Sequence, residues 1–195
     1  MASVLGGLLA EFRYEPVEVQ KGYAGQTLYI NLNTNEIKTK PVTDEMKEKF
    51  IGGKGFGLWL MWQAIPGPID WRDPRNEICI ASGPLGGTTT YPGSGKSIVT
   101  SISPTTQSVI DSNVGGHFGP LLKFAGFDAL EIQGKSEREV VIFVDGPDHA
   151  VRIYDAGGLS RDSHLLAEEL ARELSGEEGP RGFSSVSAGS AADRA

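Results

Sequence analysis

The sequence contains one cysteine, Cys79, and three histidines among its 195 residues. A single cysteine excludes an internal disulfide, a zinc site built from several cysteines and an iron–sulfur cluster held by this chain alone. Such sparing use of cysteine fits a reducing compartment, and we predict that the protein is cytoplasmic.

Positive charge is also scarce, since the chain has 18 Lys and Arg residues but 25 Asp and Glu residues, for a net charge of −7. Nucleic-acid and anionic-membrane surfaces both need a basic footprint, so neither kind of partner is predicted. No uninterrupted apolar run approaches the roughly 20 residues that span a bilayer. The opening residues, 1–12, also lack the basic region that precedes the apolar part of a secretory signal.

Glycine, by contrast, is over-represented, with 26 residues, nearly twice the usual share of about 7%. More than half of the glycines lie between Gly52 and Gly134, where Phe, Trp, Ile and Leu are interleaved with them. That mixture excludes a flexible linker. It indicates tight turns, or backbone that closely approaches a ligand.

The order of the predicted elements favours an α+β fold with mainly antiparallel sheets and a few short helices. Alternating residues on both sides of Asn33-Thr34-Asn35 predict a hairpin over 26–42. Further strands are predicted over 77–82, 98–102, 127–132, 140–144 and 150–154, and helices over 44–50, 56–65, 119–125 and 163–174.

Two boundaries complete this prediction. Residues 1–22 show no sustained period and are expected to form a loose N-terminal arm, so that residues 23–195 make up the domain. The last stretch, 181–195, begins like a strand and ends without a cap or a final apolar element. We therefore expect a domain that is truncated at its C-terminal end.

The segment Gly93-Ser94-Gly95-Lys96-Ser97 is similar to a phosphate-binding P-loop. That motif requires a further glycine where this chain has Thr90, and a strand rather than a helix is predicted to follow. The sequence therefore gives only weak support to the alternative that the protein hydrolyses nucleotides. A lysine among glycines can still meet a phosphate, because exposed N–H groups and an ammonium both favour anions.

Two other glycine-rich segments could bind a ligand. The turn at 53–57 offers N–H groups to an anion, although a plain tight turn explains it equally well. Residues 111–119 (DSNVGGHFG) predict a turn-rich loop whose oxygen atoms suit a hard cation such as Mg²⁺.

Other conspicuous side chains have simpler interpretations. His117 has no second His or Cys nearby to complete a metal pair, and Asp111 is more readily a local cap than a general base. Cys79, Trp59 and Trp62 are predicted to be core residues.

Taken together, several blocks in order resemble the N-terminal domain of tungsten-containing aldehyde:ferredoxin oxidoreductases. They are GYAGQTLYINLNTNEI, FIGGKGFG, ASGPLGGT, GSGKS, SPTTQ and DSNVGGHFGPLLKFAGFDALEIQGK. The resemblance runs from about Gly22 to Ile153 and continues weakly to the end. It implies a β-rich base that carries a tungsten bis-pterin cofactor (tungstopterin or molybdopterin), with Mg²⁺ bridging the two pterin phosphates. Dithiolene sulfurs hold the tungsten in that family, so no Cys/His cluster is needed.

The resemblance also assigns roles to three residues. It implies that Asn113 binds the magnesium through its backbone carbonyl and contacts the pterin, and that Gly115 contacts the pterin. Lys96 stands where many members have an arginine that reaches a pterin phosphate. Because lysine keeps the charge but loses the bidentate fork, we expect a weaker phosphate contact or a different subfamily. No residue of this chain is predicted to be catalytic.

The implied enzyme oxidises aldehydes to carboxylic acids and passes electrons through a [4Fe–4S] cluster to ferredoxin or an iron–sulfur electron-transfer subunit. The cysteines of that cluster lie in later domains, so we expect this chain to be an inactive fragment or one half of a split enzyme. Two alternatives stay open: a catalytic-subunit fragment of the benzoyl-CoA-reductase type, and a non-catalytic binding module. The sequence leaves open the aldehyde, tungsten versus molybdenum, homodimer formation and the stability of the isolated domain.

Overall fold

The computed structural model describes residues 4–190, except for the side chains of residues 177, 178 and 180. Its strands are β1 (Leu8–Arg13), β2 (Gln26–Asn31), β3 (Glu36–Pro41), β4 (Glu77–Ala81), β5 (Ser97–Ile102), β6 (Val109–Val114), β7 (Ala129–Gln133), β8 (Val140–Asp145) and β9 (Ala150–Asp155). Its helices are α1 (Asp44–Lys49), α2 (Lys54–Ala64), α3 (Phe118–Phe124), α4 (Ser163–Leu174) and the 3₁₀ segment η1 (Gly176–Gly182).

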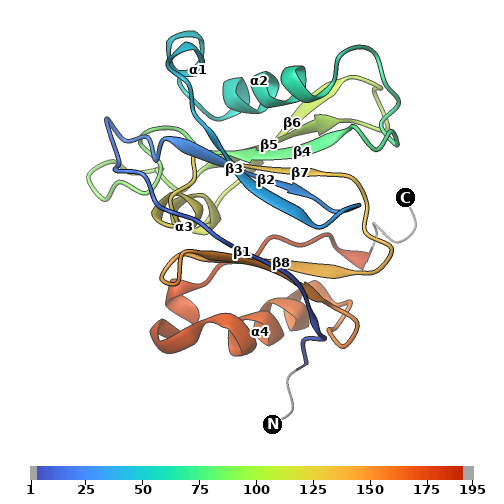
Figure 1. Ribbon diagram of the computed structural model, residues 1–195. Coiled ribbons are helices and arrows are strands. Elements are labelled where there is room, and N and C mark those ends of the chain that lie inside the picture. Colours follow the sequence, from blue (N-terminus) through green and yellow to red (C-terminus); the bar gives the residue numbers. More distant parts are fainter. Residues whose placement is uncertain (1–3, 191–195) are drawn as a thin grey trace.

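These elements form layers (Figure 1). Helices α1 and α2 lie on one face of a six-stranded sheet, and a three-stranded sheet lies against its other face, with α3 at one end between them. Helix α4 covers the outer face of the smaller sheet. No helix among residues 4–190 is both long enough and apolar enough to cross a membrane.

The larger sheet has the strand order β3-β2-β7-β4-β5-β6. All of its pairs are antiparallel except β2 and β7, which run parallel. The predicted α+β class with mainly antiparallel sheets is therefore confirmed, as is the hairpin of β2 and β3. Thr43 caps α1 by accepting a hydrogen bond from the Met46 N–H at 3.2 Å, which explains where this helix begins.

The smaller sheet corrects the expectation of a loose arm over residues 1–22. Residues Leu8–Arg13 form β1, which pairs antiparallel with β9 and completes the order β1-β9-β8. The local pattern gave no sign of this strand, because the register partner of Phe12 is Val151, far along the chain.

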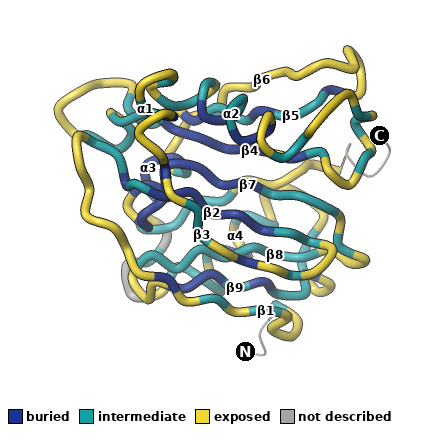
Figure 2. The backbone as a smooth tube through the Cα atoms, turned by 45° about the horizontal axis from the view of Figure 1, so that its top comes forward, coloured by how far each residue is buried: buried dark blue, intermediate teal, exposed yellow. Residues whose placement is uncertain are grey.

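The main core lies between the two sheets. Leu28 and Ile30 of β2, Phe127, and Val151 and Ile153 of β9 are buried together in it. In Figure 2 the darkest segments follow β4, β7 and β2 through the middle of the molecule, while β6 is exposed up to Asn113. The sheets thus provide a rigid centre, and the glycine-rich connections lie outside it.

A second core fills the space between α2 and the larger sheet. It contains Phe56, Leu60 and Met61 of α2, together with Cys79 of β4. The helix comes unusually close to β5, since a Cβ added at Gly57 would lie 2.4 Å from Thr100 Oγ1. Burial of Cys79 in this core confirms its predicted role as a core residue.

Two predictions about local structure are wrong. Residues 181–190 form no strand: η1 ends at Gly182, and the following segment to residue 189 is irregular. Residues 191–195, the end of the predicted segment, lie outside the described part of the chain. Trp62 is 78% exposed rather than part of the core, although Trp59 packs edge-on against Phe50.

Candidate functional site

Three glycine-rich segments meet at a shallow hollow of about 300 Å³ on the surface. It is lined by Ile51 from the α1–α2 connection, by residues 83–86, which follow β4, and by Tyr91, Gly93, Ser94 and Lys96, which precede β5. Segments that are separate blocks in the sequence thus form one surface.

Backbone contacts fix the segments around this hollow. The Gly53 N–H donates to the Ser82 carbonyl at 3.1 Å, and the Gly87 N–H donates to the Ser94 carbonyl at 3.1 Å. Gly52 is required here, because an added Cβ would lie 2.8 Å from Gly83 Cα, and its φ of 152° strains an L side chain. The turn predicted over 53–57 is in fact Gly53 followed by the first residues of α2, and Gly52 and Gly53 support the site.

Lys96 immediately precedes β5 and is exposed. Within the described residues its ammonium has no hydrogen-bond or ion-pair partner. Gly115 lies close to it, since a Cβ built on that glycine would be 3.7 Å from Lys96 Nζ. Of the three residues singled out from the sequence, Lys96 and Gly115 are thus brought together.

Asn113 lies on β6 with Ile98 as its register partner, and it is exposed. It does not line the hollow. The prediction of a turn-rich loop over 111–119 is correct only from Gly115 to His117, because residues up to Val114 belong to β6. This strand was missed since it is exposed on both faces and shows no alternation.

An ion pair ties β6 to the start of α2. Lys54 Nζ lies 2.6 Å from Asp111 Oδ1, so Asp111 acts across elements rather than as the local cap predicted for it. His117 stands at the N-cap position of α3, is exposed and makes no capping hydrogen bond with its side chain.

Two buried hydroxyls close to these segments have no hydrogen-bond partner within the described chain: Ser82 Oγ and Ser97 Oγ. Ser82 precedes the 83–86 turn, and Ser97 follows Lys96 directly. Buried polar groups are normally satisfied, so these two hydroxyls are exceptions, but both are enclosed and neither lines the hollow.

Sequence reasoning missed a buried ion pair beneath the hollow. Lys123 Nζ of α3 lies 2.8 Å from Asp128 Oδ1, and the exposed fractions of the two side chains are only 5% and 1%. Both residues stand in the block LLKFAGFDA. The only signal available was a charged residue inside an apolar run, which does not reveal its partner.

A second polar cluster is buried between the larger sheet and α2. Thr27 donates to Glu131 at 2.6 Å, Lys40 pairs with the other oxygen of Glu131, and the Cys79 thiol donates to Glu77 at 3.7 Å. Burial, helped by the negative charge of Glu131, raises the pKa of Glu77 to about 7. Burial also raises the pKa of the Cys79 thiol well above its ordinary value, so this thiol is not a reactive one.

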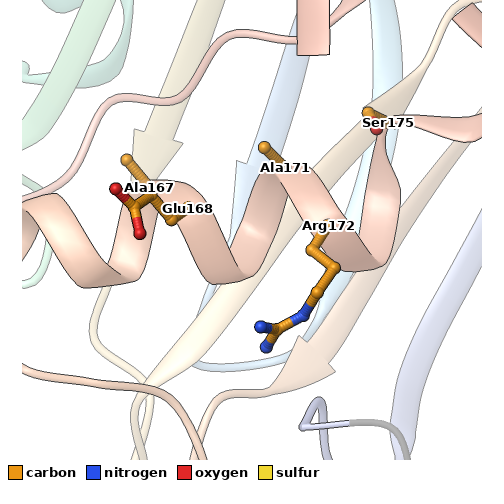
Figure 3. Close-up of a pocket in the computed structure, with 5 residues that line it drawn as sticks. All are labelled: Ala167, Glu168, Ala171, Arg172 and Ser175. Atoms are coloured by element: carbon orange, nitrogen blue, oxygen red, sulfur yellow. The ribbon is translucent and has the colours of Figure 1, made fainter. Parts of the chain in front are cut away.

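A further hollow of about 520 Å³ lies along α4 and is lined by residues of one helical stripe and the C-cap (Figure 3). These residues are Ala167, Glu168, Ala171, Arg172 and Ser175. Figure 3 shows Ala167 and Ala171 on one side of the helix, with the guanidinium of Arg172 directed away from them. None of the glycine-rich blocks contributes to it, so we do not assign the ligand site there.

Within residues 4–190 no group of three or more His, Cys, Asp or Glu side chains could hold a metal ion.

Comparison with known proteins identifies the family. Residues 27–195 match the family described as the N-terminal domain of aldehyde ferredoxin oxidoreductase. The chain belongs to this family. The resemblance noted in the sequence is thus confirmed, and the glycine-lined hollow lies inside the matched region.

Two curated relatives are tungsten-containing aldehyde ferredoxin oxidoreductases. The protein from Pyrococcus horikoshii is 36% identical over 172 residues, which are 88% of this chain and 27% of the relative. The protein from Pyrococcus furiosus is 36% identical over 150 residues, which are 77% of this chain and 23% of the relative. The chain therefore spans about a quarter of the length of these relatives.

A solved structure has the same fold as this family member. It is the active site complex BamBC of benzoyl coenzyme A reductase in complex with 1,5-dienoyl-CoA, and it matches with a TM-score of 0.74 at 27% sequence identity. The match covers 80% of this chain and 24% of the other. The homologues are thus oxidoreductases, and the predicted fold type of this domain is confirmed.

Proposed function

We propose that this chain binds a tungsten or molybdenum bis-pterin at the glycine-lined hollow. The enzyme it belongs to would oxidise aldehydes to carboxylic acids, with ferredoxin as the electron acceptor. One observation carries the proposal: the exposed ammonium of Lys96, without a partner among the described residues, lines the hollow where three glycine-rich segments meet. An unpaired cation surrounded by accessible backbone suits an anionic ligand.

The residues present fit the phosphates of such a cofactor. Lys96 provides the charge, and the absence of a side chain at Gly115 leaves space within 3.7 Å of its ammonium. Binding here requires no thiolate or imidazole from this chain.

Asn113 is the proposed magnesium ligand. Its neighbour Val114 pairs with Ser97, so Asn113 lies on the strand beside the one that Lys96 precedes. A backbone carbonyl is a ligand that Mg²⁺ accepts, and Mg²⁺ commonly binds together with phosphates. We therefore propose that the backbone carbonyl of Asn113 would hold a magnesium ion beside the phosphates, and that the backbone of Gly115 would contact the pterin.

The bound metal would supply the two-electron redox chemistry, and the protein supplies binding, orientation and electrostatics. In this division of roles Lys96 neutralises phosphate charge, the 83–86 and 93–96 segments orient the pterin, and the sheets hold these segments at fixed positions. We further propose that the remaining polypeptide or a partner subunit encloses the metal and holds a [4Fe–4S] cluster. Ferredoxin or an iron–sulfur subunit would then accept the electrons in the cytoplasm.

The structural match to the benzoyl-CoA reductase complex supports a second candidate, a fragment of a catalytic subunit that acts on an aromatic CoA thioester. Both candidates share the cofactor site. They differ in the substrate pocket, to which the described residues contribute no assigned group, so a substrate assay must separate them.

Metal and pterin analysis tests the proposal directly. The chain is expressed in a host that makes tungstopterin, with and without the coding region that follows it. Tungsten or molybdenum with pterin in the longer product supports the cofactor site, and assays with aldehydes and with dienoyl-CoA then choose between the two candidates. Absence of pterin from both products would contradict the proposal and favour a non-catalytic binding module.

A further inference from the structure

Lys123 is buried beneath the glycine-lined hollow, and all three hydrogens of its ammonium are in use. Nζ donates to the Gly22 carbonyl at 2.9 Å, to the Gly83 carbonyl at 3.0 Å and to Asp128 Oδ1 at 2.8 Å. A lysine has no further donor to offer. Lys123 therefore cannot contact a phosphate, in contrast to the exposed Lys96.

Asp128 extends the same network to a second loop. Its Oδ1 accepts a hydrogen bond from the Ala24 N–H at 3.1 Å, and its Oδ2 accepts one from the Gly25 N–H at 2.8 Å. The pair thus joins the loop at 22–25 to α3 and to Gly83. These groups are far apart in the sequence, and backbone hydrogen bonds of Asp128 to Gln26 and Ser82 bring the same segments together.

Gly83 is the point at which this network reaches the hollow. Its carbonyl accepts a hydrogen bond from the Gly86 N–H at 2.9 Å, in addition to the bond from Lys123. Residues 83–86 all line the hollow. A bond to the first residue of this turn therefore fixes the backbone that the hollow presents.

The loop at 22–25 supports the turn from another side. A Cβ added at Gly22, where φ is 83°, would lie 2.2 Å from the Pro84 carbonyl oxygen. Phe124, the neighbour of Lys123, packs in the same way against the end of the turn, since a Cβ added at Gly87 would lie 2.9 Å from its ring.

We propose that Lys123, paired with Asp128, is a positioning residue of the pterin site. It fixes the Gly83–Gly86 turn and thereby the backbone groups that orient the cofactor, without touching the cofactor itself. This inference rests on the proposed function for its ligand, but its central claim, that Lys123 holds the turn, is independent of any ligand.

The variant for the test is Lys123→Met combined with Asp128→Asn. Removing the lysine alone would leave a buried carboxylate without compensation, and such variants are often strongly destabilised. The double variant removes both charges, and the asparagine Oδ1 can still accept a hydrogen bond from the 24–25 backbone. The control is Ile153→Ala in the inter-sheet core, which lowers stability without contacting the hollow.

Amide hydrogen exchange of the Gly86 and Gly87 N–H groups measures whether the turn is held. In the double variant we expect both to exchange at least about tenfold faster relative to Leu130 and Ile132 of β7, which report opening of the whole sheet. In Ile153→Ala the ratio of turn to strand exchange should stay as in the unaltered protein. An unchanged ratio in the double variant would overturn the proposal, because the pair would then stabilise the fold in general.

The Lys123→Arg variant guards against a failure to fold, since it keeps a positive charge beside Asp128. A planar guanidinium directs its N–H groups within one plane and cannot reproduce three diverging bonds. We expect the same two amides to exchange faster, by a smaller factor than in the double variant. If the double variant does not fold, Lys123→Arg decides alone. Unchanged exchange of the Gly86 and Gly87 amides in it would then overturn the proposal.

Pterin content per folded molecule tests the consequence for binding. It should fall several-fold in the Lys123 variants and stay unchanged in Ile153→Ala, all in the polypeptide of natural length. Full pterin content in the variants would overturn the positioning role. Absence of pterin from the unaltered protein would instead contradict the proposed function, and the exchange measurement would still decide whether Lys123 holds the turn.

Discussion

Two lysines lie near the same hollow, and their surroundings indicate that one contacts the ligand and the other holds the backbone in place. Lys96 is exposed and unpaired within the described residues, whereas Lys123 is buried and fully bonded. From their charge alone, both lysines would be predicted to contact the anionic ligand. Burial and the number of occupied donors assign only Lys96 to it.

Substitutions at Lys96 should therefore change pterin retention in both directions. A hydrogen bond to a charged group contributes about 1.5–3 kcal/mol, so Lys96→Met should weaken retention about tenfold or more. Lys96→Arg should strengthen it, because a guanidinium can contact a phosphate with two parallel bonds. Pterin content after extended dialysis measures this. Lys135→Met serves as the control, since Lys135 is also exposed but follows β7 outside the hollow.

The buried carboxyl group of Glu77 should make the stability of the protein depend on pH. Burial together with Glu131 raises its pKa from 4.5 to about 7 in the folded state. Between these values the folded protein holds a proton that the unfolded chain has lost, so stability falls as the pH rises from about 4.5 to 7. Lys40, Glu131 and Cys79 are the titratable groups that act on it.

Glu77→Gln should remove this part of the pH dependence, because an amide does not titrate. The difference in pH dependence between the two proteins should amount to at most about 3 kcal/mol, at 1.36 kcal/mol for each pKa unit. Denaturant unfolding at pH 5, 6, 7 and 8 measures it. Parallel stability curves for both proteins over this range would show that Glu77 carries its charge in the folded state.

At the scale of elements, the close approach of α2 to β5 depends on glycine. Alanine is normally about 1 kcal/mol better than glycine inside a helix. Gly57→Ala should instead destabilise the protein by about 1–3 kcal/mol, because its Cβ would lie 2.8 Å from Thr100 Cβ. Thermal unfolding measures this. Gly67→Ala, where a Cβ meets no heavy atom within 4 Å, is the matched control and should be close to neutral.

Helices and strands whose pattern lies within their own segment could be predicted from the sequence. Strands that depend on pairing with a remote segment could not. The hairpin of β2 and β3 has alternation and turn residues within one segment, and α4 has its apolar stripe and Asp162 cap. By contrast, β1 exists because β9 offers it an edge, and β6 exists because β5 does.

The candidate site shows the same limit. Lys96 and Gly115 could be singled out, since each stands in a recognisable glycine-rich block. Lys123 and Asp128 could not, because their role depends on Gly22 and Gly83, which no spacing rule relates to them. Predicting such a pair requires the packing of α3 against two loops.

At the scale of the whole molecule, the apolar rim of the hollow should govern self-association. Ile51, Leu85 and Tyr91 are more than half exposed there. Clustered apolar surface of this kind marks an interaction site or an aggregation hazard. We expect the isolated chain to associate at concentrations at which the product with the following coding region stays dispersed.

The Ile51→Ser variant tests whether the rim is responsible. Burying such a side chain contributes about 1.5–3 kcal/mol, so the concentration needed for association should rise about tenfold or more. Sedimentation velocity over a concentration series gives this value, with the equally exposed Trp62→Ser outside the hollow as the control. A cleanly monomeric isolated chain, or equal effects of both substitutions, would contradict the prediction.

The parallel pairing of β2 with β7 has a consequence for how the chain is synthesised. Thr27 and Ala129 are register partners although about a hundred residues separate them, and all glycine-rich segments of the hollow lie between them. During translation the early hairpin lacks its neighbour in the sheet until the ribosome has released β7, and Leu28 and Ile30 lack Val151 and Ile153 of β9 for longer still. Pairings at such sequence separation form slowly, so we expect the first hairpin to expose apolar side chains to solvent for most of the time that the chain takes to be made.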